Sequence, residues 1–340
     1  MRAAYVRVPF EVEFRDIPIP EIAPDDVLVR VEACGICGTD LHFARDLAKD
    51  EAMPLGHEFV GVVEKVGTNV TDHAPGERVV VENHTACGVC EACKNGTPVY
   101  CTNPDIVMNQ PCLAEFVRAP RTALHRYDGM TPSAAVLAEP LTVALDVVEE
   151  AGLPIGSDVA VFGAGPIGLM VLKLAKMKGA RKVLLTARSH SKARIALAKK
   201  LGANRVVEVD KEDLVEVARR EFPAGVERVF VTAPPVTIPS AFEIARFGAT
   251  IVFNGISFEN SMISFDANDF HFKRLQLHAT HSIPNLRFPI ALDLVKSKAV
   301  DPDLFISHTF AFDDLPEALR IAENDKERAV KVVVTMASNR

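Results

Sequence analysis

A short glycine motif that follows an apolar run is the feature that most constrains the fold of this chain of 340 residues. The sequence Gly-Ala-Gly-Pro-Ile-Gly at 163–168 comes after the apolar residues 159–162 and opens a mostly apolar stretch that continues to about residue 178. Glycines in this setting allow a tight turn, close approach of the backbone to a pyrophosphate, and close packing of the helix on the strand. The helix start adds free N–H groups and a dipole that favours phosphate. The motif therefore predicts a dinucleotide-binding turn; a purely structural turn is the alternative.

The residues around this motif alternate between strand and helix patterns. Strand-like runs follow at 182–186, 205–207, 228–232 and 250–254. The clearest helix between them spans 191–201, and Gly202 can end it. Such alternation predicts an α/β fold with a doubly wound parallel sheet. The turn residues that we expect to bind the dinucleotide are Gly163, Gly165, Pro166, Ile167 and Gly168.

The strand at 182–186 ends in residues that bear on the choice between NAD and NADP. An NAD site usually has Asp or Glu near this point to bind the ribose 2′-hydroxyl. Here Ala187 stands in its place, and Arg188, Ser189 and Lys192 follow. Two cations and a hydroxyl could hold a 2′-phosphate, which predicts a preference for NADP. The alternatives are that the cations only decorate an exposed helix start, and that NAD is the cofactor.

The rest of the chain has a different pattern. Residues 1–35 alternate apolar and polar positions, and strands are expected at 27–31, 59–66 and 78–81, which indicates a β-rich domain to about residue 150. The last part of the chain predicts, in order, a helix at 290–298, a strand at 305–310, a helix at 315–322 and a strand at 329–334.

Composition excludes several classes of protein. A net charge of −7, with no run of five basic residues, argues against binding nucleic acid or a membrane surface. No apolar stretch is long enough to cross a bilayer, and the N-terminus has no secretory pattern. Four of the seven cysteines crowd into fifteen residues, which favours metal thiolates in a reducing compartment. We therefore expect a cytoplasmic protein.

The four crowded cysteines follow the spacing C-x2-C-x2-C-x7-C. They are Cys87, Cys90, Cys93 and Cys101. Four thiolates bind zinc in a closed tetrahedral site that leaves no position for substrate, so we expect a structural zinc ion. An iron–sulfur cluster is the first alternative, although such runs close with a nearer cysteine followed by proline. Disulfides and unliganded thiols are the others.

A second possible metal set lies upstream of these cysteines. Cys37 offers a thiolate, His57 an imidazole and Glu58 a carboxylate, and these three ligand types suit zinc. Glu139, within an apolar segment, is a further candidate ligand because a buried carboxylate needs a partner. Taken singly, each residue also has an ordinary interpretation: a buried thiol, a core histidine, or a carboxylate at a helix start.

Taken together, these motifs resemble the medium-chain, zinc-dependent alcohol and polyol dehydrogenase family. The segments that carry the resemblance are CGICGTDLH (34–42), GHEFVG (56–61), GERV (76–79), CGVCEACKNGTPVYC (87–101), AEPLTVAL (138–145) and VFGAGPIG (161–168). The resemblance implies a GroES-like catalytic domain over 1–150, completed by 284–340, and a Rossmann domain over 151–283.

The resemblance also implies roles for individual residues. Cys37 and His57 match catalytic zinc ligands, and Glu58 matches a glutamate that coordinates the metal or exchanges with water on it. Glu139 stands where polyol and threonine dehydrogenases place a glutamate, which leaves open whether Glu58 or Glu139 completes the site. The other four cysteines match the ligands of a structural zinc ion, so two zinc ions per chain are expected.

Three residues near Cys37 match a proton path and its support. Thr39 matches the hydroxyl that begins a proton relay, and His42 matches the solvent end of that relay. Asp40 matches a carboxylate that orients a zinc-bound imidazole. We therefore expect these residues to serve catalysis.

The implied activity is oxidation of a secondary alcohol and the reverse reduction of its ketone, with a polyol, cyclitol or sugar alcohol as substrate. Threonine or an amino-cyclitol is the runner-up. Sorbitol itself is disfavoured because the segment around residues 281–284 lacks an Arg-Tyr pair expected in sorbitol dehydrogenases. The alternative from another class is a non-catalytic relative, which would be expected to lose Cys37 or His57 first. A homo-oligomer, dimer or tetramer, is implied by the family.

Overall fold

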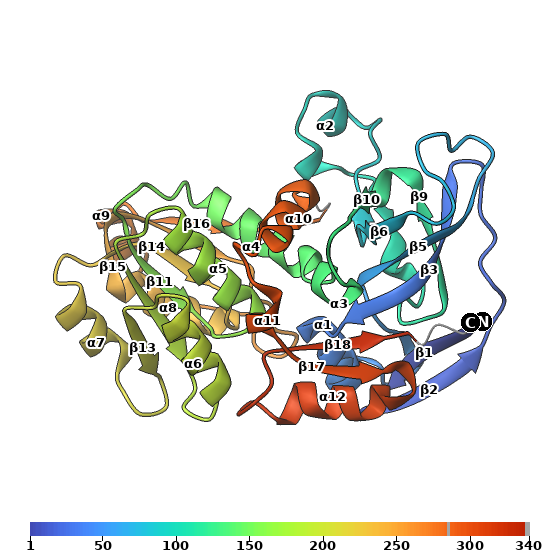
Figure 1. Ribbon diagram of the computed structural model, residues 1–340. Coiled ribbons are helices and arrows are strands. Elements are labelled where there is room, and N and C mark those ends of the chain that lie inside the picture. Colours follow the sequence, from blue (N-terminus) through green and yellow to red (C-terminus); the bar gives the residue numbers. More distant parts are fainter. Residues whose placement is uncertain (284–285, 337–340) are drawn as a thin grey trace. The chain divides into compact units, whose positions relative to one another are not determined.

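The computed structural model describes residues 1–283 and 286–336 (Figure 1). The chain forms two compact units, which are described separately. One comprises Met1–Thr142, Ser282–Asp325 and Lys331–Arg340, apart from the six residues that are not described, and the other comprises Val143–His281 and Lys326–Val330. Two of the six, Pro284 and Asn285, begin the segment 284–340 that was expected to complete the catalytic domain.

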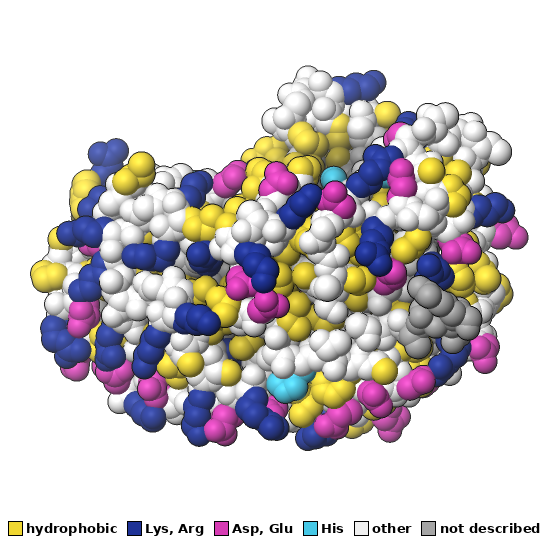
Figure 2. Space-filling model, in the orientation of Figure 1, with side chains coloured by type: hydrophobic (Ala, Val, Ile, Leu, Met, Phe, Trp, Pro, Cys, Tyr) yellow, Lys and Arg dark blue, Asp and Glu magenta, His cyan; other side chains and the backbone are white. Residues whose placement is uncertain are grey.

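The face seen in Figure 2 carries basic and acidic side chains intermingled. No helix in the described part of the chain combines the length and the apolar character that crossing a membrane requires.

The first unit is built around a sheet of seven strands, in the order β10-β6-β5-β3-β18-β17, with β9 also paired to β3. Its strands are β3 (Asp26–Gly35), β5 (Glu58–Val66), β6 (Arg78–Val81), β9 (Phe116–Pro120), β10 (Leu124–Arg126), β17 (Ile306–Ala311) and β18 (Lys331–Thr335). All pairings are antiparallel except that of β17 with β18. Val27, Val29 and Val31 of β3 are buried, as their alternation predicts. The strands predicted in these regions are present, with small shifts at their ends.

The pairing of β3 with β5 is irregular, and the irregularities determine where the end of β3 lies. Its register shifts between Leu28 and Val29 and again between Val31 and Ala33. Such bulges bend a strand and redirect the residues that follow. Beyond them Gly35 lies opposite Glu58 of β5 and, on its other side, opposite Val333 of β18. Three segments that are far apart in sequence therefore meet at the end of β3.

Smaller elements complete the first unit. They are β1 (Arg2–Arg7), β2 (Glu11–Asp16), β4 (Met53–Pro54), β7 (His84–Thr85), β8 (Asp105–Ile106), α1 (Gly38–His42), a π-helix (Phe43–Leu47), α2 (Glu91–Lys94), α3 (Pro132–Ala135), α10 (Phe288–Lys296), α11 (Pro302–Phe305) and α12 (Leu315–Asn324), with short 3-10 turns between them. Strands β2, β1 and β4 form a separate sheet, and β7 pairs with β8.

The second unit contains a parallel sheet of six strands in the order β13-β12-β11-β14-β15-β16. Its strands are β11 (Asp158–Phe162), β12 (Lys182–Ala187), β13 (Arg205–Glu208), β14 (Val226–Val231), β15 (Ala245–Phe253) and β16 (Gln276–Ala279), and its helices are α5 (Pro166–Met177), α6 (Lys192–Lys200), α7 (Leu214–Glu221), α8 (Ile238–Ile244) and α9 (Ala267–Phe272). Numbered within this unit, the strand order is 3-2-1-4-5-6, which is the Rossmann order. The predicted α/β fold is confirmed.

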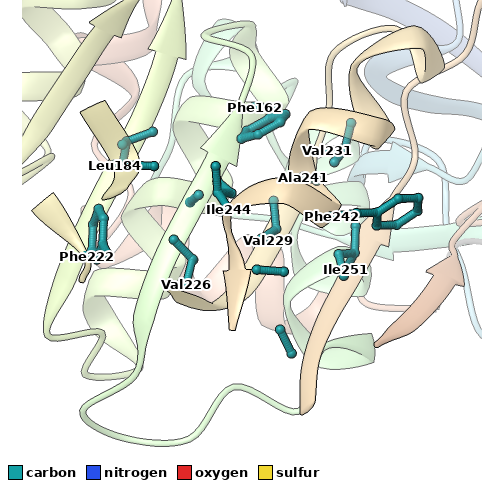
Figure 3. Close-up of a cluster of buried hydrophobic side chains, with 14 of the residues drawn as sticks. Phe162, Leu184, Phe222, Val226, Val229, Val231, Ala241, Phe242, Ile244 and Ile251 are labelled. Carbon is teal, nitrogen blue, oxygen red and sulfur yellow. The ribbon is translucent and has the colours of Figure 1, made fainter. Parts of the chain in front are cut away.

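Apolar side chains from the strands and from α8 fill the core of this unit. Phe162, Val229, Phe242 and Ile251 are at most 4% exposed and belong to one continuous cluster (Figure 3). Burial of a side chain of this size stabilises a fold by about 1.5–3 kcal/mol. The cluster thus anchors the strands whose ends carry the glycine turn.

Helix α4 and strand β16 are among the elements that were not predicted. Helix α4 spans Ala138–Glu150 and has Pro140 in its first turn, where proline is tolerated. Its residues up to Thr142 belong to the first unit and those from Val143 to the second. Strand β16 is short, lies at the edge of the sheet, and has the sequence Gln-Leu-His-Ala without an apolar run.

Candidate functional site

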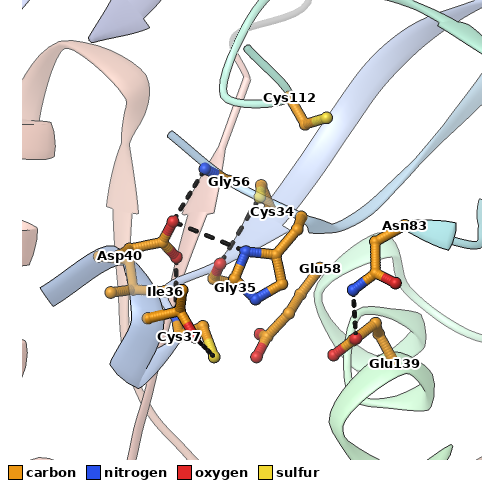
Figure 4. A network of polar contacts seen from close by, with 12 residues as sticks. Cys34, Gly35, Ile36, Cys37, Asp40, Gly56, Glu58, Asn83, Cys112 and Glu139 are labelled. Carbon is orange, nitrogen blue, oxygen red and sulfur yellow. Dashed lines mark hydrogen bonds and ion pairs between the residues drawn. The ribbon is translucent and has the colours of Figure 1, made fainter. Parts of the chain in front are cut away.

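Helix α1 positions Cys37 and Asp40. Cys37 is the residue that precedes the first turn, and its N–H donates to the Asp40 carboxylate at 2.9 Å. The other carboxylate oxygen accepts from the Gly56 N–H at 3.0 Å, and Asp40 is fully buried. Asp40 therefore fastens the loop that carries His57 to the helix that carries Cys37 (Figure 4).

His57 is buried beside the same carboxylate. Its Nδ1 lies 3.7 Å from an Asp40 oxygen, beyond hydrogen-bonding distance, and has no hydrogen-bond partner among the described residues. Burial would lower the pKa of His57, but the facing Cys37 and Asp40 outweigh it and raise the pKa well above its usual value. The surroundings of the imidazole therefore favour positive charge.

Cys37, His57 and Glu58 come together as a possible metal site. The thiol sulfur, a ring nitrogen and a carboxylate oxygen all lie within 4.8 Å of one another. Sulfur, imidazole and carboxylate in one small group suit zinc. Among the described residues, the structure brings together the first three of the four predicted ligands, but Glu139 is outside this group.

Lys331 also belongs to this site and was not predicted. It is 2% exposed, its ammonium is ion-paired with Glu58, and it donates to the Ile36 carbonyl at 3.0 Å. Burial would lower the pKa of Lys331, but Glu58 and Cys37 outweigh it and raise the pKa. A lysine within the apolar run of residues 329–334 was the signal that could have identified it.

The buried carboxylates that the structure describes around the cluster outnumber the buried cationic side chains there, even when His57 carries a positive charge. Asp40, Glu58 and Glu139 are buried carboxylates, and Lys331 is the one buried ammonium beside them in the described part of the chain. Uncompensated buried charge is costly in a protein interior. A divalent ion bound by Cys37, His57 and Glu58 would offset this excess negative charge. The residues present therefore fit a zinc ion.

Glu139 lies at the start of α4 and is 4% exposed. The side-chain amide of Asn83 donates to it at 2.7 Å. Asn83 was not predicted, and nothing in the sequence near it indicates this contact. The amide holds Glu139 where it contributes negative charge to the surroundings of His57 and Lys331.

Thr39 and His42 both lie on α1. The Thr39 hydroxyl is 3.8 Å from the Cys37 sulfur. His42 is near the surface, where its Nδ1 lies 2.6 Å from an Arg45 guanidinium nitrogen and 3.7 Å from Asp46. One helix thus has a hydroxyl at the cluster and an imidazole near solvent.

The four-cysteine lobe brings its sulfur atoms into one group. Cys90 lies 3.4 Å from Cys93 and 3.8 Å from Cys101, and Cys101 lies 3.6 Å from Cys87, sulfur to sulfur. Zinc–sulfur bonds of about 2.3 Å in a tetrahedron separate thiolates by about 3.8 Å. All four are free thiols, not disulfides. The group fits a single tetrahedral ion.

Backbone N–H groups favour the thiolate form of two of these four cysteines, whereas burial and the neighbouring Cys90 raise the pKa of Cys93 to about 12. Hydrogen bonds from the backbone of Val89 and Cys90 lower the pKa of Cys87. Those from Cys93 and Thr102 lower the pKa of Cys90 to about 6. Because the thiolate is the metal-binding form, both shifts favour binding at neutral pH.

The glycine turn has the shape that a dinucleotide requires. Gly163 has a φ of +105°, and its N–H donates to the Thr186 hydroxyl at 3.0 Å. A Cβ at Gly168 would lie 2.0 Å from the Gly163 carbonyl oxygen, whereas one at Gly165 would meet nothing within 4 Å. Pro166 and Ile167 begin α5 directly after the turn. The open space at Gly165 fits approach of a pyrophosphate to the backbone.

The residues expected to hold a 2′-phosphate already have partners, with one exception. Both donors of Ser189 are bonded to Asp210, and Lys192 is ion-paired with Glu327. The Arg188 side chain is exposed, and no hydrogen bond or ion pair joins its guanidinium to another described residue. Neither Asp210 nor Glu327 was predicted to lie at these residues.

Comparison with known proteins supports one family. Residues 23–129 match the alcohol dehydrogenase GroES-like domain, and residues 166–297 match the zinc-binding dehydrogenase domain. An L-threonine 3-dehydrogenase of Anaeromyxobacter sp. (strain K) is 31% identical over 96% of this chain and 95% of its own length. A sorbitol dehydrogenase of Bacillus subtilis (strain 168) is 28% identical over 98% of this chain and 97% of its own length.

Solved structures have the same fold. A zinc-binding dehydrogenase from Sinorhizobium meliloti 1021, bound to NADP, has a TM-score of 0.88 at 31% identity and covers 98% of each chain. An alcohol dehydrogenase from E. coli CFT073, complexed with NADH, has a TM-score of 0.88 at 28% identity, covering 98% of this chain and 99% of its own.

Proposed function

Because this chain belongs to the medium-chain, zinc-dependent dehydrogenase family, we propose that it interconverts a secondary alcohol and its ketone with a nicotinamide cofactor. The observation that carries the proposal is the group formed by Cys37, His57 and Glu58. A non-catalytic relative would have no need of such a group in addition to the four-cysteine lobe.

We propose that Cys37, His57 and Glu58 hold a catalytic zinc ion and that Glu139 supports the site from its bond to Asn83. The four-cysteine lobe would hold a second, structural zinc ion. Zinc at the first site would supply a Lewis acid that polarises a substrate oxygen, and the nicotinamide would accept hydride. Asp40 fixes the relative position of His57 and Cys37.

Thr39 and His42 are the proposed route for the hydroxyl proton. The Thr39 hydroxyl, beside Cys37, is placed to accept a hydrogen bond from a substrate hydroxyl. His42 can exchange a proton with water because its side chain is 27% exposed. The chain thus provides a proton acceptor near the cluster and a titratable group near solvent on one helix.

The proposed substrate is a polyol, cyclitol or sugar alcohol. The segment Glu139-Pro140-Leu141 resembles the polyol and threonine branches of the family, and a sorbitol dehydrogenase is among the relatives. L-Threonine or an amino-cyclitol is the second candidate, supported by the threonine dehydrogenase relative. A substrate panel that includes both groups separates the two.

We propose NADP as the preferred cofactor, with NAD as the alternative. Ala187 presents no carboxylate to a 2′-phosphate, and Arg188 has a free guanidinium within the described structure. The ratio of kcat/KM for NADP and NAD tests this preference. A tenfold preference for NAD would overturn it without affecting the proposed reaction.

The domain roles and cellular setting are also proposals. Residues 1–150 with 284–340 would form the catalytic domain, and 151–283 the cofactor domain. The protein would act in the cytoplasm as a dimer or tetramer, without a nucleic-acid or membrane partner.

A direct experiment covers the reaction and both ions. The purified protein is assayed with polyols, cyclitols and L-threonine, and its metal content is measured. Substrate-dependent reduction of cofactor by a protein that holds two zinc ions per chain is the expected result. A folded, metal-replete protein that binds one ion and reduces no cofactor would refute the proposal.

A further inference from the structure

The carboxylate of Asp210 accepts the hydrogen bonds that Ser189 donates from the loop after β12. The Ser189 N–H donates to Oδ1 of Asp210 at 2.8 Å, and the Ser189 hydroxyl donates to Oδ2 at 2.6 Å. Both oxygens of one carboxylate are thus bound by the two donors of one residue. The two donors of Ser189 can bind an anion, and in this structure they bind the carboxylate of Asp210.

Strand register brings the two residues together. Strands β12 and β13 are parallel neighbours with Ala187 opposite Glu208. The Val209 N–H continues this pairing by donating to the Ala187 carbonyl at 3.0 Å. Two residues beyond each member of the Ala187–Glu208 pair lie Ser189 and Asp210, so their contact follows from the register. Asp210 is exposed, so its side chain is not locked in place by packing.

The charged side chains near Ser189 determine which other anion could replace the Asp210 carboxylate there. Arg188 has no ion-pair partner among the described residues, whereas the Lys192 ammonium is paired with Glu327. A phosphate offers the same acceptor geometry as a carboxylate with more charge. It could replace Asp210 at Ser189 and gain Arg188 as a partner. While Asp210 stays in place, it repels any second anion.

We propose that Asp210 is a specificity-determining residue of the cofactor site: its carboxylate holds the two Ser189 donors that the 2′-phosphate of NADP needs, and so limits preference for NADP over NAD. The inference rests on the proposed dinucleotide function and names a residue that sets its selectivity. Loss of the competing charge should strengthen binding of a 2′-phosphate and should have little effect on an adenosine that lacks one.

Two small probes test this without turnover. Calorimetry measures binding of 2′,5′-ADP, which carries the 2′-phosphate, and of 5′-AMP, which does not. We expect Asp210→Asn to tighten 2′,5′-ADP about tenfold and to change 5′-AMP less than twofold, because the lost charge acts on the 2′-phosphate. The tightening should shrink at high salt, since the site is exposed.

Glu208→Gln provides the matched control. It removes one negative charge two residues away, where Glu208 contacts Lys211 and not Ser189. It should change 2′,5′-ADP binding less than threefold. A second variant, Asp210→Ala, removes the acceptor as well as the charge. Combining it with Ser189→Ala should remove part of the gain, because the hydroxyl donor is then lost while the backbone N–H of residue 189 remains.

The outcomes separate this inference from the function beneath it. If the wild-type protein binds both probes and Asp210→Asn leaves their ratio unchanged, or weakens 2′,5′-ADP, Asp210 does not set selectivity and only this inference fails. An equal gain in 2′,5′-ADP affinity with Glu208→Gln also overturns the inference, since the effect would then come from the total charge near the site and not from Asp210. If neither probe nor either nicotinamide cofactor binds, both the inference and the proposed function fail.

Discussion

The Lys331 ammonium lies against the Glu58 carboxylate, and the two side chains are only 2% and 1% exposed. They are brought together because β18 and β5 flank β3 on opposite sides at its end. Glu58 is therefore both a candidate metal ligand and one half of a buried ion pair.

Replacement of Lys331 by Met should destabilise the metal-free protein by about 3–5 kcal/mol, because it leaves the Glu58 carboxylate buried without its partner. Chemical denaturation in the presence of a chelator measures the change. Lys211→Met is the control, because the Lys211–Glu208 pair is on the surface and should contribute less than about 1 kcal/mol. Equal unfolding midpoints for wild type and Lys331→Met would contradict the assigned role.

Gly35 makes room for this pair. A Cβ at residue 35 would lie 2.1 Å from a Glu58 carboxylate oxygen and 3.0 Å from the Lys331 side chain. Gly35→Ala should therefore lower stability by about 1–3 kcal/mol through overpacking and should displace Glu58. Zinc content and unfolding midpoint are the measurements. Gly38→Ala, where a Cβ meets nothing within 4 Å, should retain two zinc ions; the account is wrong if both variants behave alike.

Two glycines of the turn should differ in what their replacement by alanine changes: protein stability at Gly168 and cofactor binding at Gly165. Gly168→Ala should destabilise the protein, because its Cβ would lie 2.0 Å from the Gly163 carbonyl oxygen. Gly165→Ala should leave the melting temperature within a few degrees of wild type but weaken NADP binding at least tenfold, because a methyl group would fill the space expected for the pyrophosphate. Calorimetry and thermal unfolding distinguish the two effects. Unchanged NADP affinity in Gly165→Ala would show that the pyrophosphate does not approach this turn.

The four-cysteine lobe predicts a pH dependence. Backbone N–H groups lower the pKa of Cys90 to about 6, so its thiolate is favoured in the folded state above that pH and this stabilisation is lost as the pH falls through about 6. In zinc-stripped protein, alkylation of Cys90 should stay fast at pH 7 and decline towards pH 5. Cys112, whose pKa burial raises, is the internal control and should react slowly throughout. Decline of Cys90 alkylation already between pH 9 and 8 would contradict the prediction.

Sequence reasoning reached those features of the fold and site that are encoded locally. The glycine turn, the alternating elements and the two ligand sets each lie within short segments whose spacing carries the signal. The strand runs were found because alternation or an apolar run defines them. In β16 the alternation of Gln276 and His278 with Leu277 and Ala279 covers only four residues, and it was overlooked.

The partners of these residues could not be predicted because they come from distant strands. Lys331 reaches Glu58 through the register of β18 on β3, and Asp210 reaches Ser189 through the register of β13 on β12. Asn83 meets Glu139 across 56 residues. A strand pattern predicts that a strand exists, but not which residue lies opposite which, and these contacts depend on that register.

The central claim is that Cys37, His57 and Glu58 hold a metal ion on which activity depends. Zinc counts for wild type, Cys37→Ser and the neighbouring control Cys34→Ala, with alcohol-dependent cofactor reduction assayed on the same samples, test it most directly. The account predicts two zinc ions in the wild type and in Cys34→Ala, and one zinc ion with no turnover in a folded Cys37→Ser. One zinc ion in the wild type, or full activity in Cys37→Ser, would contradict it.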